Sequence, residues 1–447
     1  MNTDGIIAIR SCVIEELVVD HSTADALLVT NSRIGRLIIR NAPLNCDITV
    51  HDSTFETLDV HSCGAVRFEG VRVADSLQVA SLRGPVHLKR VRAAAISLRG
   101  QATAGRLRRP TVALEGVHVM EAVNLDDLWI ASLTLQEIDA AALELRRVRV
   151  DAPFEGKEVR CREGLRINGM VVAGEANALV DSEVQGTVEV RGLRHVSTVP
   201  AQRRDPETPP SEPEMAQLVF RSSTISRLAA SAENSSPMVI ELSDTAVTEA
   251  LALPGGPARY RLDGTSSIHE VDLGDVVFRR HDHVTGFLDR VFTRVTPGAL
   301  EAVRSTLARR RRRAEEDQLY YFTRQREADT EGHRLRRLAM RALLGGILGW
   351  GVRARNPART LAVAVFATGL VLHGTGAVRG HGANTLMSLS AMGRAMILAC
   401  ALWLNIGTGA PSELKTFGWT ALAACCAVGG LLFTTLTVGI VIRKLVR

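Results

Sequence analysis

The chain has 447 residues, of which 46% are hydrophobic, 23% charged and only 4% aromatic. This composition is typical of a folded protein and excludes a collagen, a disordered tail and a disulfide-stabilised mini-protein. Seven cysteines without a CxxC spacing favour a reducing compartment over a disulfide framework or a zinc site. The first ten residues contain no long apolar leader, so we expect no cleaved signal peptide.

The net charge of +6 is distributed unevenly. Residues 301–359 contain fifteen arginines and seven acids, an excess of +8, so the rest of the chain carries −2. Basic proteins often bind nucleic acid. Here, however, the arginines lie just before the first long apolar run, where the positive-inside rule places them. We therefore interpret the cluster of arginines as a topology signal beside a membrane span, and we expect no nucleic-acid partner.

Pairs of aliphatic residues two positions apart recur every 19 to 21 residues in the N-terminal part of the chain. One series comprises Leu17 and Val19, Leu37 and Ile39, Leu58 and Val60, Leu77 and Val79, and Ile96 and Leu98; a second, about half a repeat away, comprises Leu27 and Val29, Ile48 and Val50, Val66 and Phe68, and Val86 and Leu88. Alternation within a pair is the strand period, and a fixed longer period is typical of a solenoid. Residues 1–195 are therefore predicted to form a parallel β-solenoid, with polar residues such as Asn41 and Asp52 at its corners.

Residues 196–215 contain five prolines and several charges, so we expect a Pro-rich flexible loop there. Strand-like runs resume at 218–220 and 238–242, and residues 216–283 are predicted to continue the solenoid. The expected fold class is thus mainly β, with a helical connector and a C-terminal α-helical membrane domain after the solenoid.

Residues 284–357 are predicted to form the Arg-rich helical connector, since Pro297 is followed by apolar residues at helical spacing. The most basic part is a run of five arginines, Arg309, Arg310, Arg311, Arg312 and Arg313. Five consecutive residues surround a helix, so one side of this run is expected to contact anionic lipid headgroups. The alternative is a solvated helix surface.

Residues 358–447 are predicted to form a two-span membrane domain. Residues 360–378 and 417–442 contain no Asp, Glu, Lys or Arg and are long enough to cross a bilayer. Basic residues precede the first span and follow the second, so the positive-inside rule predicts that both termini lie in the cytoplasm. Gly429 and Gly430, in the middle of the second span, are a candidate gating hinge, although close helix packing explains them equally well.

Between the spans, residues 391–404 form a short apolar helix that is too short for a comfortable full span. It is followed by a glycine-containing run: Asn405, Ile406, Gly407, Thr408 and Gly409. Extended backbone at membrane depth is tolerated only where it lines water or is buried by protein. We therefore predict a re-entrant pore helix followed by a pore loop.

This order of span, short helix, Asn405–Gly409 run and span resembles the two-span pore-loop module of potassium-channel-like proteins, whose filter reads Thr-Val-Gly-Tyr-Gly. Gly407, Gly409 and the aliphatic Ile406 match, whereas Asn405 and Thr408 differ. The whole chain resembles bacterial pentapeptide-repeat-like membrane proteins, in which a cytoplasmic β-solenoid precedes an Arg-rich helical segment and an ion-channel-like domain. This resemblance implies a multi-pass protein of the bacterial cytoplasmic (inner) membrane. The strict five-residue repeat is absent here.

The resemblance implies an oligomeric channel, most simply a tetramer, in which carbonyl oxygens of residues 405–408 replace the water shell of a permeant K⁺ or Na⁺ ion. No cofactor, metal site or catalytic residue is expected, because the chain contains no Walker loop, GxSxG or HExxH motif. We therefore predict no enzyme. The alternative function is a membrane-anchored solenoid scaffold that binds a cytoplasmic protein partner without conducting ions.

Overall fold

The computed structural model describes residues 5–20, 23–41, 46–61, 64–100, 109–173, 177–195, 215–232, 237–273, 281–330, 355–377, 389–404 and 417–446, and single residues 278, 334, 338, 341 and 414. The chain divides into two compact units, Met1–Arg313 and Ala314–Arg447. The predicted Pro-rich loop falls outside the described residues except for Met215.

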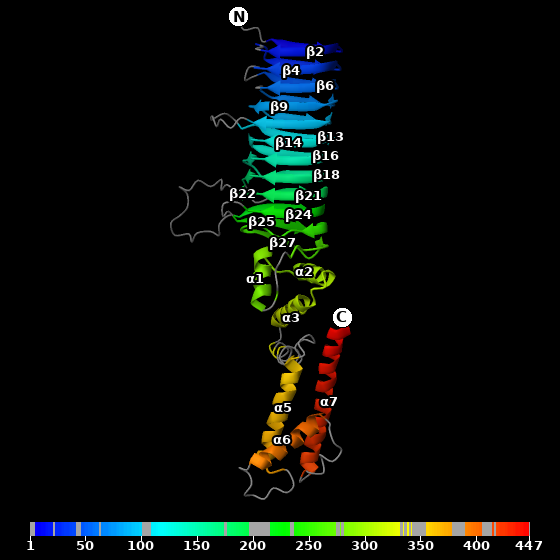
Figure 1. Ribbon diagram of the computed structural model, residues 1–447. Coiled ribbons are helices and arrows are strands. Elements are labelled where there is room, and N and C mark those ends of the chain that lie inside the picture. The colour runs from blue at the N-terminus through cyan, green and yellow to red at the C-terminus, as the bar shows by residue number, and fades with distance from the viewer. Residues whose placement is uncertain are drawn as a thin grey trace, which may run out of the picture. The chain divides into compact units, whose positions relative to one another are not determined.

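The first unit contains a parallel β-solenoid of about 11 turns, and the chain is mainly β with 49% of its residues in strands (Figure 1). Strands β1 to β28 are, in chain order, Ile6–Arg10, Val13–Asp20, Ala26–Thr30, Arg33–Arg40, Asp47–His51, Thr54–His61, Val66–Glu69, Arg72–Val73, Ser76–Leu82, Val86–Lys89, Arg92–Ala93, Ala95–Gly100, Thr111–Val119, Ala122–Asp126, Trp129–Ile130, Ser132–Arg146, Arg149–Val150, Glu155–Asn168, Val171–Val172, Ala178–Val180, Glu183–Arg191, Arg194–His195, Ala216–Arg221, Thr224–Ser231, Met238–Ser243, Ala246–Leu251, Ala258–Leu262 and Ser267–Ile268.

Three columns of parallel strands run along the solenoid, and a fourth, shorter column is formed by β15, β17, β19 and β22. Face 1 contains β1, β3, β5, β7, β10 and the segments in register with them. Face 2 contains the first residues of β2, β4 and β6, then β8, β11 and the segments that follow them in register. Face 3 contains the last residues of β2, β4 and β6, then β9, β12 and β14.

The aliphatic pairs of the sequence repeat form continuous stacks inside the solenoid. On face 3 the stack is Leu17, Leu37, Leu58, Leu77, Ile96, Val123, Leu143, Leu165, Val188, Leu228 and Leu251. On face 1 it is Ile9, Val29, Val50, Phe68, Leu88, Leu114, Leu135, Gly156, Leu179, Phe220, Leu242 and Leu262. Apolar side chains meet at every turn of these stacks except at Gly156, because the register is in phase with the repeat. The predicted solenoid is confirmed, and stacked aliphatic residues fill its core.

The corner between faces 1 and 2 has one residue in the left-handed conformation in each turn. These residues are Ser11, Asn31, Asp52, Gly70, Arg90, Gly116, Glu137, Glu158, Asp181, Ser222 and Asp244. Asn, Asp and Gly tolerate positive φ best, which explains several of these choices. The next residue points inward, and where it is serine it bonds along the stack: the Ser32 N–H donates to the Ser53 hydroxyl over 3.2 Å.

Two helices, α1 (His281–Val291) and α2 (Pro297–Arg309), follow the last strand. The N–H of Val271 donates to the Thr306 hydroxyl of α2 over 2.8 Å, and Thr306 is fully buried. The N–H of Thr293 donates to the carbonyl oxygen of Tyr260 over 2.9 Å. These contacts cover the C-terminal end of the solenoid.

The observed boundaries differ from the predicted ones. Helix α1 begins inside the predicted solenoid range 216–283, and the predicted connector 284–357 is divided between the two units.

The second unit contains the described helices α3 (Arg313–Thr330), α5 (Arg355–Gly374), α6 (Leu389–Leu404) and α7 (Phe417–Val446). Helices α5, α6 and α7 share a small core. The indole N–H of Trp403 in α6 donates to the Thr368 hydroxyl in α5 over 2.9 Å. The backbone of Trp403 also lies against Gly430 of α7. A short apolar helix thus packs against both long ones.

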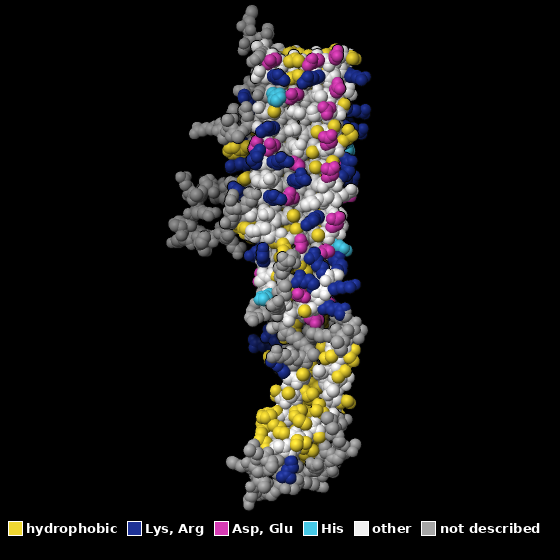
Figure 2. Space-filling model, viewed as in Figure 1, with side chains coloured by type: hydrophobic (Ala, Val, Ile, Leu, Met, Phe, Trp, Pro, Cys, Tyr) yellow, Lys and Arg dark blue, Asp and Glu magenta, His cyan; other side chains and the backbone are white. Residues whose placement is uncertain are grey.

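Two helical segments of this unit are long and apolar enough to cross a membrane. Asn356–Gly374 has a mean hydropathy of 1.2 over its most apolar stretch, and Gly418–Ile442 reaches 2.2. They coincide closely with the two predicted spans. Large apolar side chains cover the outer surface of these helices, as Figure 2 shows. Helices α5 and α7 therefore present an apolar exterior, whereas α3 is rich in charged residues.

Candidate functional site

A groove of about 960 Å³ follows face 2 of the solenoid. It is lined by β4, β6, β8, β11, β13, β16 and β18. The floor is made by the inward residues of face 2, which change from Ile34 and Phe55 to the smaller Val73 and Ala93. Because β8 and β11 contain only two residues each, and the exposed Ala74 follows β8, the surface is hollowed at these turns.

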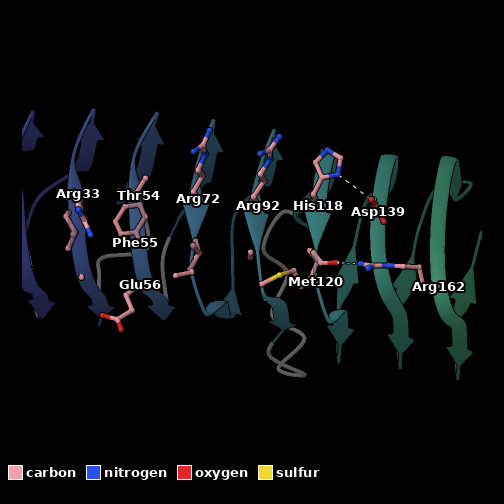
Figure 3. A pocket seen from close by; sticks show the side chains of 16 residues that line it. Arg33, Thr54, Phe55, Glu56, Arg72, Arg92, His118, Met120, Asp139 and Arg162 are labelled. Carbon is pink, nitrogen blue, oxygen red and sulfur yellow. Dashed lines mark hydrogen bonds and ion pairs between the residues drawn. The ribbon is translucent and has the colours of Figure 1, made fainter.

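Basic side chains occupy one wall of this groove in adjacent register positions. Arg33 is opposite Thr54, and Thr54 is opposite Arg72. Arg72 is then directly opposite Arg92, which is opposite His118. Figure 3 shows Arg72, Arg92 and His118 pointing to the same side from neighbouring strands. Like charges directly opposite each other on neighbouring strands destabilise a sheet, so this arrangement has an energetic cost.

Many outward arginines elsewhere on the solenoid lie beside acids of the neighbouring turn. These pairs include Arg90 with Glu69, Arg147 with Asp126 and Asp127, Arg166 with Glu144, and Arg261 with Glu241. In contrast, no described acid lies within ion-pair distance of Arg33, Arg72 or Arg92. Other exposed arginines, such as Arg227 and Arg259, also have no described acid within ion-pair distance, and the groove differs from them in placing Arg72 and Arg92 directly opposite each other.

The basic groove lies on an acidic segment. Residues 1–300 contain 33 lysines and arginines but 40 aspartates and glutamates. The excess of arginine in the groove is consequently local and does not reflect a generally basic solenoid. Long-range attraction of a polyanion to this segment is therefore weak, whereas a short anionic group inside the groove meets unneutralised guanidinium groups.

The far end of the groove is fixed by two contacts that Figure 3 shows as dashed lines. His118 Nδ1 lies 3.8 Å from an oxygen of Asp139, and an Nη of Arg162 donates to the carbonyl oxygen of Val119 over 3.4 Å. Beside them, Met120 is 67% exposed. A large exposed apolar side chain next to unpaired arginines makes the groove both apolar and basic.

A second hollow of about 570 Å³ lies at the corner after face 3, around Arg147, Arg166, Arg191 and Arg194. Here Arg147, Arg166 and Arg191 are paired with acids. Arg194 is different, since its Nε is buried without a hydrogen-bond partner. This hollow is nearly neutralised by its own side chains, and the groove on face 2 is the stronger candidate for binding.

The buried thiols of the solenoid have no sign of nucleophilic activation. Burial raises the pKa of the Cys161 thiol to about 12, with the nearby Asp139 acting in the same direction. Burial also raises the pKa of Cys46, which lies beside Asp47 and Asp25. A thiol of this kind stays protonated near neutral pH and packs as an apolar group. Within the described ranges, no group of three or more His, Cys, Asp or Glu residues is arranged to hold a metal ion.

The predicted filter residues Asn405, Ile406, Gly407, Thr408 and Gly409 lie outside the described residues. The predicted hinge glycines do not interrupt α7, which continues from Phe417 to Val446. Instead, both lie against Trp403: an added Cβ on Gly429 would come within 3.0 Å of its ring, and one on Gly430 within 1.5 Å of its carbonyl oxygen. Close packing therefore accounts for Gly430, and the hinge stays a prediction.

The five-arginine run does not surround one helix, contrary to the sequence interpretation. α2 ends at Arg309 and α3 begins at Arg313, with Arg311 in the left-handed conformation between them. Arg310 turns toward the end of the solenoid, where its Nε donates to Glu270 over 2.7 Å. Contact between the five-arginine run and lipid headgroups stays a prediction, and Arg310 forms an ion pair with Glu270 of the solenoid.

The groove was missed at the sequence level. The sequence did contain a signal for it. Ile34 lies three residues before the pair that begins at Leu37, and Phe55 lies three residues before the pair that begins at Leu58; both are inward residues of face 2. The residue before each of these positions points outward into the groove, and in later turns it is Arg72, Arg92 or His118. Aligning the repeats on this position would have brought the arginines together.

No family model, no curated protein and no solved structure matches this chain.

Proposed function

We propose that this protein is a membrane-anchored β-solenoid scaffold whose face-2 groove binds a partner protein. The observation that carries the proposal is the register of Arg72 opposite Arg92 in a hollowed, partly apolar face, without an acid beside either. A cost of this kind is compensated when a partner supplies the missing negative charge. The parallel ladders hold the groove residues on rigid elements, as a binding surface requires.

The anchor in this proposal is the helix pair α5 and α7. Val363 and Phe366 of α5 and Leu431 and Leu432 of α7 are each more than half exposed. An apolar surface of this extent is stable in lipid and aggregates in water. Arg355 and Arg359 precede the apolar part of α5, and Arg443 follows the span in α7, which supports cytoplasmic termini in a bacterial cytoplasmic membrane.

The proposal is tested by placing a photo-activatable amino acid at Ala74 in the groove of the full-length protein in cells. Irradiation should give one discrete covalent adduct with a partner. The same group at Thr134, an exposed position on face 1, should give none. Carbonate washing should leave the adduct in the membrane fraction.

Two double variants are compared in this test, and each removes two positive charges, one inside the groove and the other outside it. Arg72→Ser with Arg92→Ser should abolish the adduct. Arg227→Ser with Arg259→Ser, which alters two exposed arginines outside the groove, should leave it unchanged. An adduct that survives the groove variant, or is lost equally in both, removes the groove from the function.

Ion conduction is the second candidate function, and α6 favours it. This apolar helix has 16 residues, too few for a comfortable span, and packs against both α5 and α7. A short helix between two spans is the arrangement expected of a re-entrant pore helix. In this proposal several copies of the chain, most simply four, surround a path lined by residues 405–408.

Liposomes containing the purified protein test conduction directly. A channel should pass K⁺ or Na⁺, and Gly407→Trp should stop the flux because a bulky side chain fills the narrowest part of the path. Flux that Gly407→Trp leaves unaltered would remove the filter assignment. Flux at the level of empty liposomes, together with a retained Ala74 adduct, favours the scaffold alone.

A further inference from the structure

We infer that the groove on face 2 binds an extended, acidic segment of polypeptide in which acidic and apolar side chains alternate. This inference rests on the proposed scaffold function and specifies the chemistry of the partner. It follows from the charge of one wall, the apolar character of the floor, and the spacing of the turns.

The first step is the charge of the ligand. Arg33, Arg72 and Arg92 have no acid within ion-pair distance among the described residues, and Arg162 contacts only the carbonyl oxygen of Val119. A guanidinium group binds carboxylate through two parallel N–H donors, which makes carboxylate a fitting ligand. The groove contains acids of its own, Glu56 and Asp139. Asp139 lies beside His118, at the end of the arginine row, so the row itself stays unneutralised.

The second step is the spacing. Neighbouring turns of the solenoid are separated by about 4.8 Å, so the positions from Arg33 to Arg162 extend over about 29 Å. An extended polypeptide advances by about 3.4 Å per residue, and side chains on one side recur every ~6.8 Å. Arg72 and Arg92 are one turn apart and have long side chains that spread readily. Two acids at positions i and i+2 therefore reach Arg92 and Arg72 together, and an acid at i+4, on the same side of the extended chain, reaches Arg33, which lies two turns beyond Arg72.

The third step is the apolar side of the groove. Val73 and Ala93 form a floor of small side chains, and the exposed Ala74 and Met120 lie beside it. Because alternate side chains of an extended chain point to opposite sides, a segment whose acids face the arginine wall places its other side chains against these apolar residues. Methionine adapts to ligands of different shape, which suits a groove that accepts short apolar side chains.

A nucleic acid fits the same groove poorly. Single-stranded nucleic acids bind by stacking bases on exposed aromatic rings, and the aromatic residue of this groove, Phe55, is only 4% exposed. Glu56 and Asp139 would lie close to a continuous phosphate chain. The surrounding segment also contains more acids than bases, so it repels a long polyanion. Polypeptide is therefore the class that the groove favours.

The test measures binding of a fluorescein-labelled 12-residue peptide, in which Asp alternates with Leu or Ala, to the full-length protein in detergent micelles. Fluorescence anisotropy should show saturable binding that weakens from 0.1 to 0.5 M salt. The matched peptide with Asn in place of Asp should bind at least about tenfold more weakly, because each lost charged hydrogen-bond pair removes a strong contact.

Variant proteins then locate the site. Arg72→Gln with Arg92→Gln should weaken binding by about tenfold or more, whereas Arg227→Gln with Arg259→Gln should leave it within about twofold. Circular dichroism of both variants should match that of the unaltered protein, because all four arginines are exposed. Equal affinity for the Asp and Asn peptides, or equal loss in both variants, overturns the inference.

Two further results separate this inference from the proposed function. An oligothymidylate of twelve nucleotides that competes as well as the acidic peptide overturns the polypeptide class. If the Ala74 adduct forms in cells but the acidic peptide does not bind, the scaffold proposal stands and only the acidic chemistry is wrong. If both are absent, the proposed function fails as well.

Discussion

The solenoid and the C-terminal helices use the same aliphatic residues in opposite ways. Leu58 is 0% exposed inside the stack of face 3, whereas Leu432 on α7 is 59% exposed. In the solenoid, backbone ladders hold every turn in register, so aliphatic side chains meet inside and charges stay outside. In α5 and α7, long helices share only a small core, and most apolar side chains point outward. The comparison teaches that one residue type forms the core of the solenoid and the outer surface of α5 and α7, a surface that suits lipid if these helices are the proposed anchor.

The largest expected effect comes from placing a charge in each environment. Leu58→Asp should prevent the solenoid from folding, because a buried carboxylate without a partner costs several kcal/mol or more. Loss of the β-sheet signal in circular dichroism and aggregation of the full chain would record this. Leu432→Asp should leave the β-sheet signal intact.

The same α7 variant tests the lipid side of the comparison. An acidic residue near the centre of a span disfavours insertion by about 2.5–3.5 kcal/mol. We therefore expect a smaller share of Leu432→Asp than of the unaltered protein in carbonate-washed membranes. A protein that remains fully in the membrane fraction with Asp at this position would mean that this side of α7 does not face lipid.

An intermediate effect is expected from glycine substitutions in α7. In Gly430→Ala the new Cβ meets the Trp403 carbonyl oxygen, so α6 and α7 must separate, at a cost of about 1–3 kcal/mol. Nothing lies within 4 Å of the corresponding position on Gly439, so Gly439→Ala is the matched control.

Thermal unfolding of the detergent-solubilised protein distinguishes the two glycines. The helical transition should occur at lower temperature in Gly430→Ala and be unchanged in Gly439→Ala. If the two variants unfold at the same temperature, Gly430 is not closely packed against Trp403. The predicted gating hinge would then be the remaining role for this glycine.

The smallest expected effect is a pH dependence confined to the solenoid. Burial raises the pKa of Asp263, but hydrogen bonds from Ser266, Thr265 and the Asp244 N–H outweigh it and hold the pKa well below its usual value. An unfolded aspartate titrates near about 3.9, so the stabilisation is present above that pH and is lost as the pH falls through the lower folded-state pKa.

Acid titration followed by circular dichroism tests this dependence. The β-sheet signal should decrease below about pH 4, while the signal of α5, α6 and α7 persists because these helices contain no Asp or Glu. Asp263→Asn should lower stability at neutral pH and reduce the acid dependence. Identical acid transitions in the two proteins would show that Asp263 contributes nothing to stability.

The repeat and the two long apolar helices were predictable from the sequence for a simple reason. Pairs such as Leu37 and Ile39 recur at the period of the fold itself, and 417–442 contains no charged residue, so local pattern and tertiary position agree. The five-arginine run was misread because helix continuity depends on one residue, Arg311, whose left-handed conformation no periodicity reveals.

The order of the side chains along the chain thus determined which residues form the solenoid core and which helices have an apolar surface, because both depend on spacing alone. Only the tertiary structure decided which side chains of distant segments lie opposite each other. Arg72 and Arg92 are 20 residues apart in the chain, yet the parallel register places them on adjacent strands. Trp403 meets Gly430 only because α6 packs between two longer helices. The charge and the free space around a surface residue depend on its neighbours in three dimensions, and the pattern of residues along the chain does not identify those neighbours.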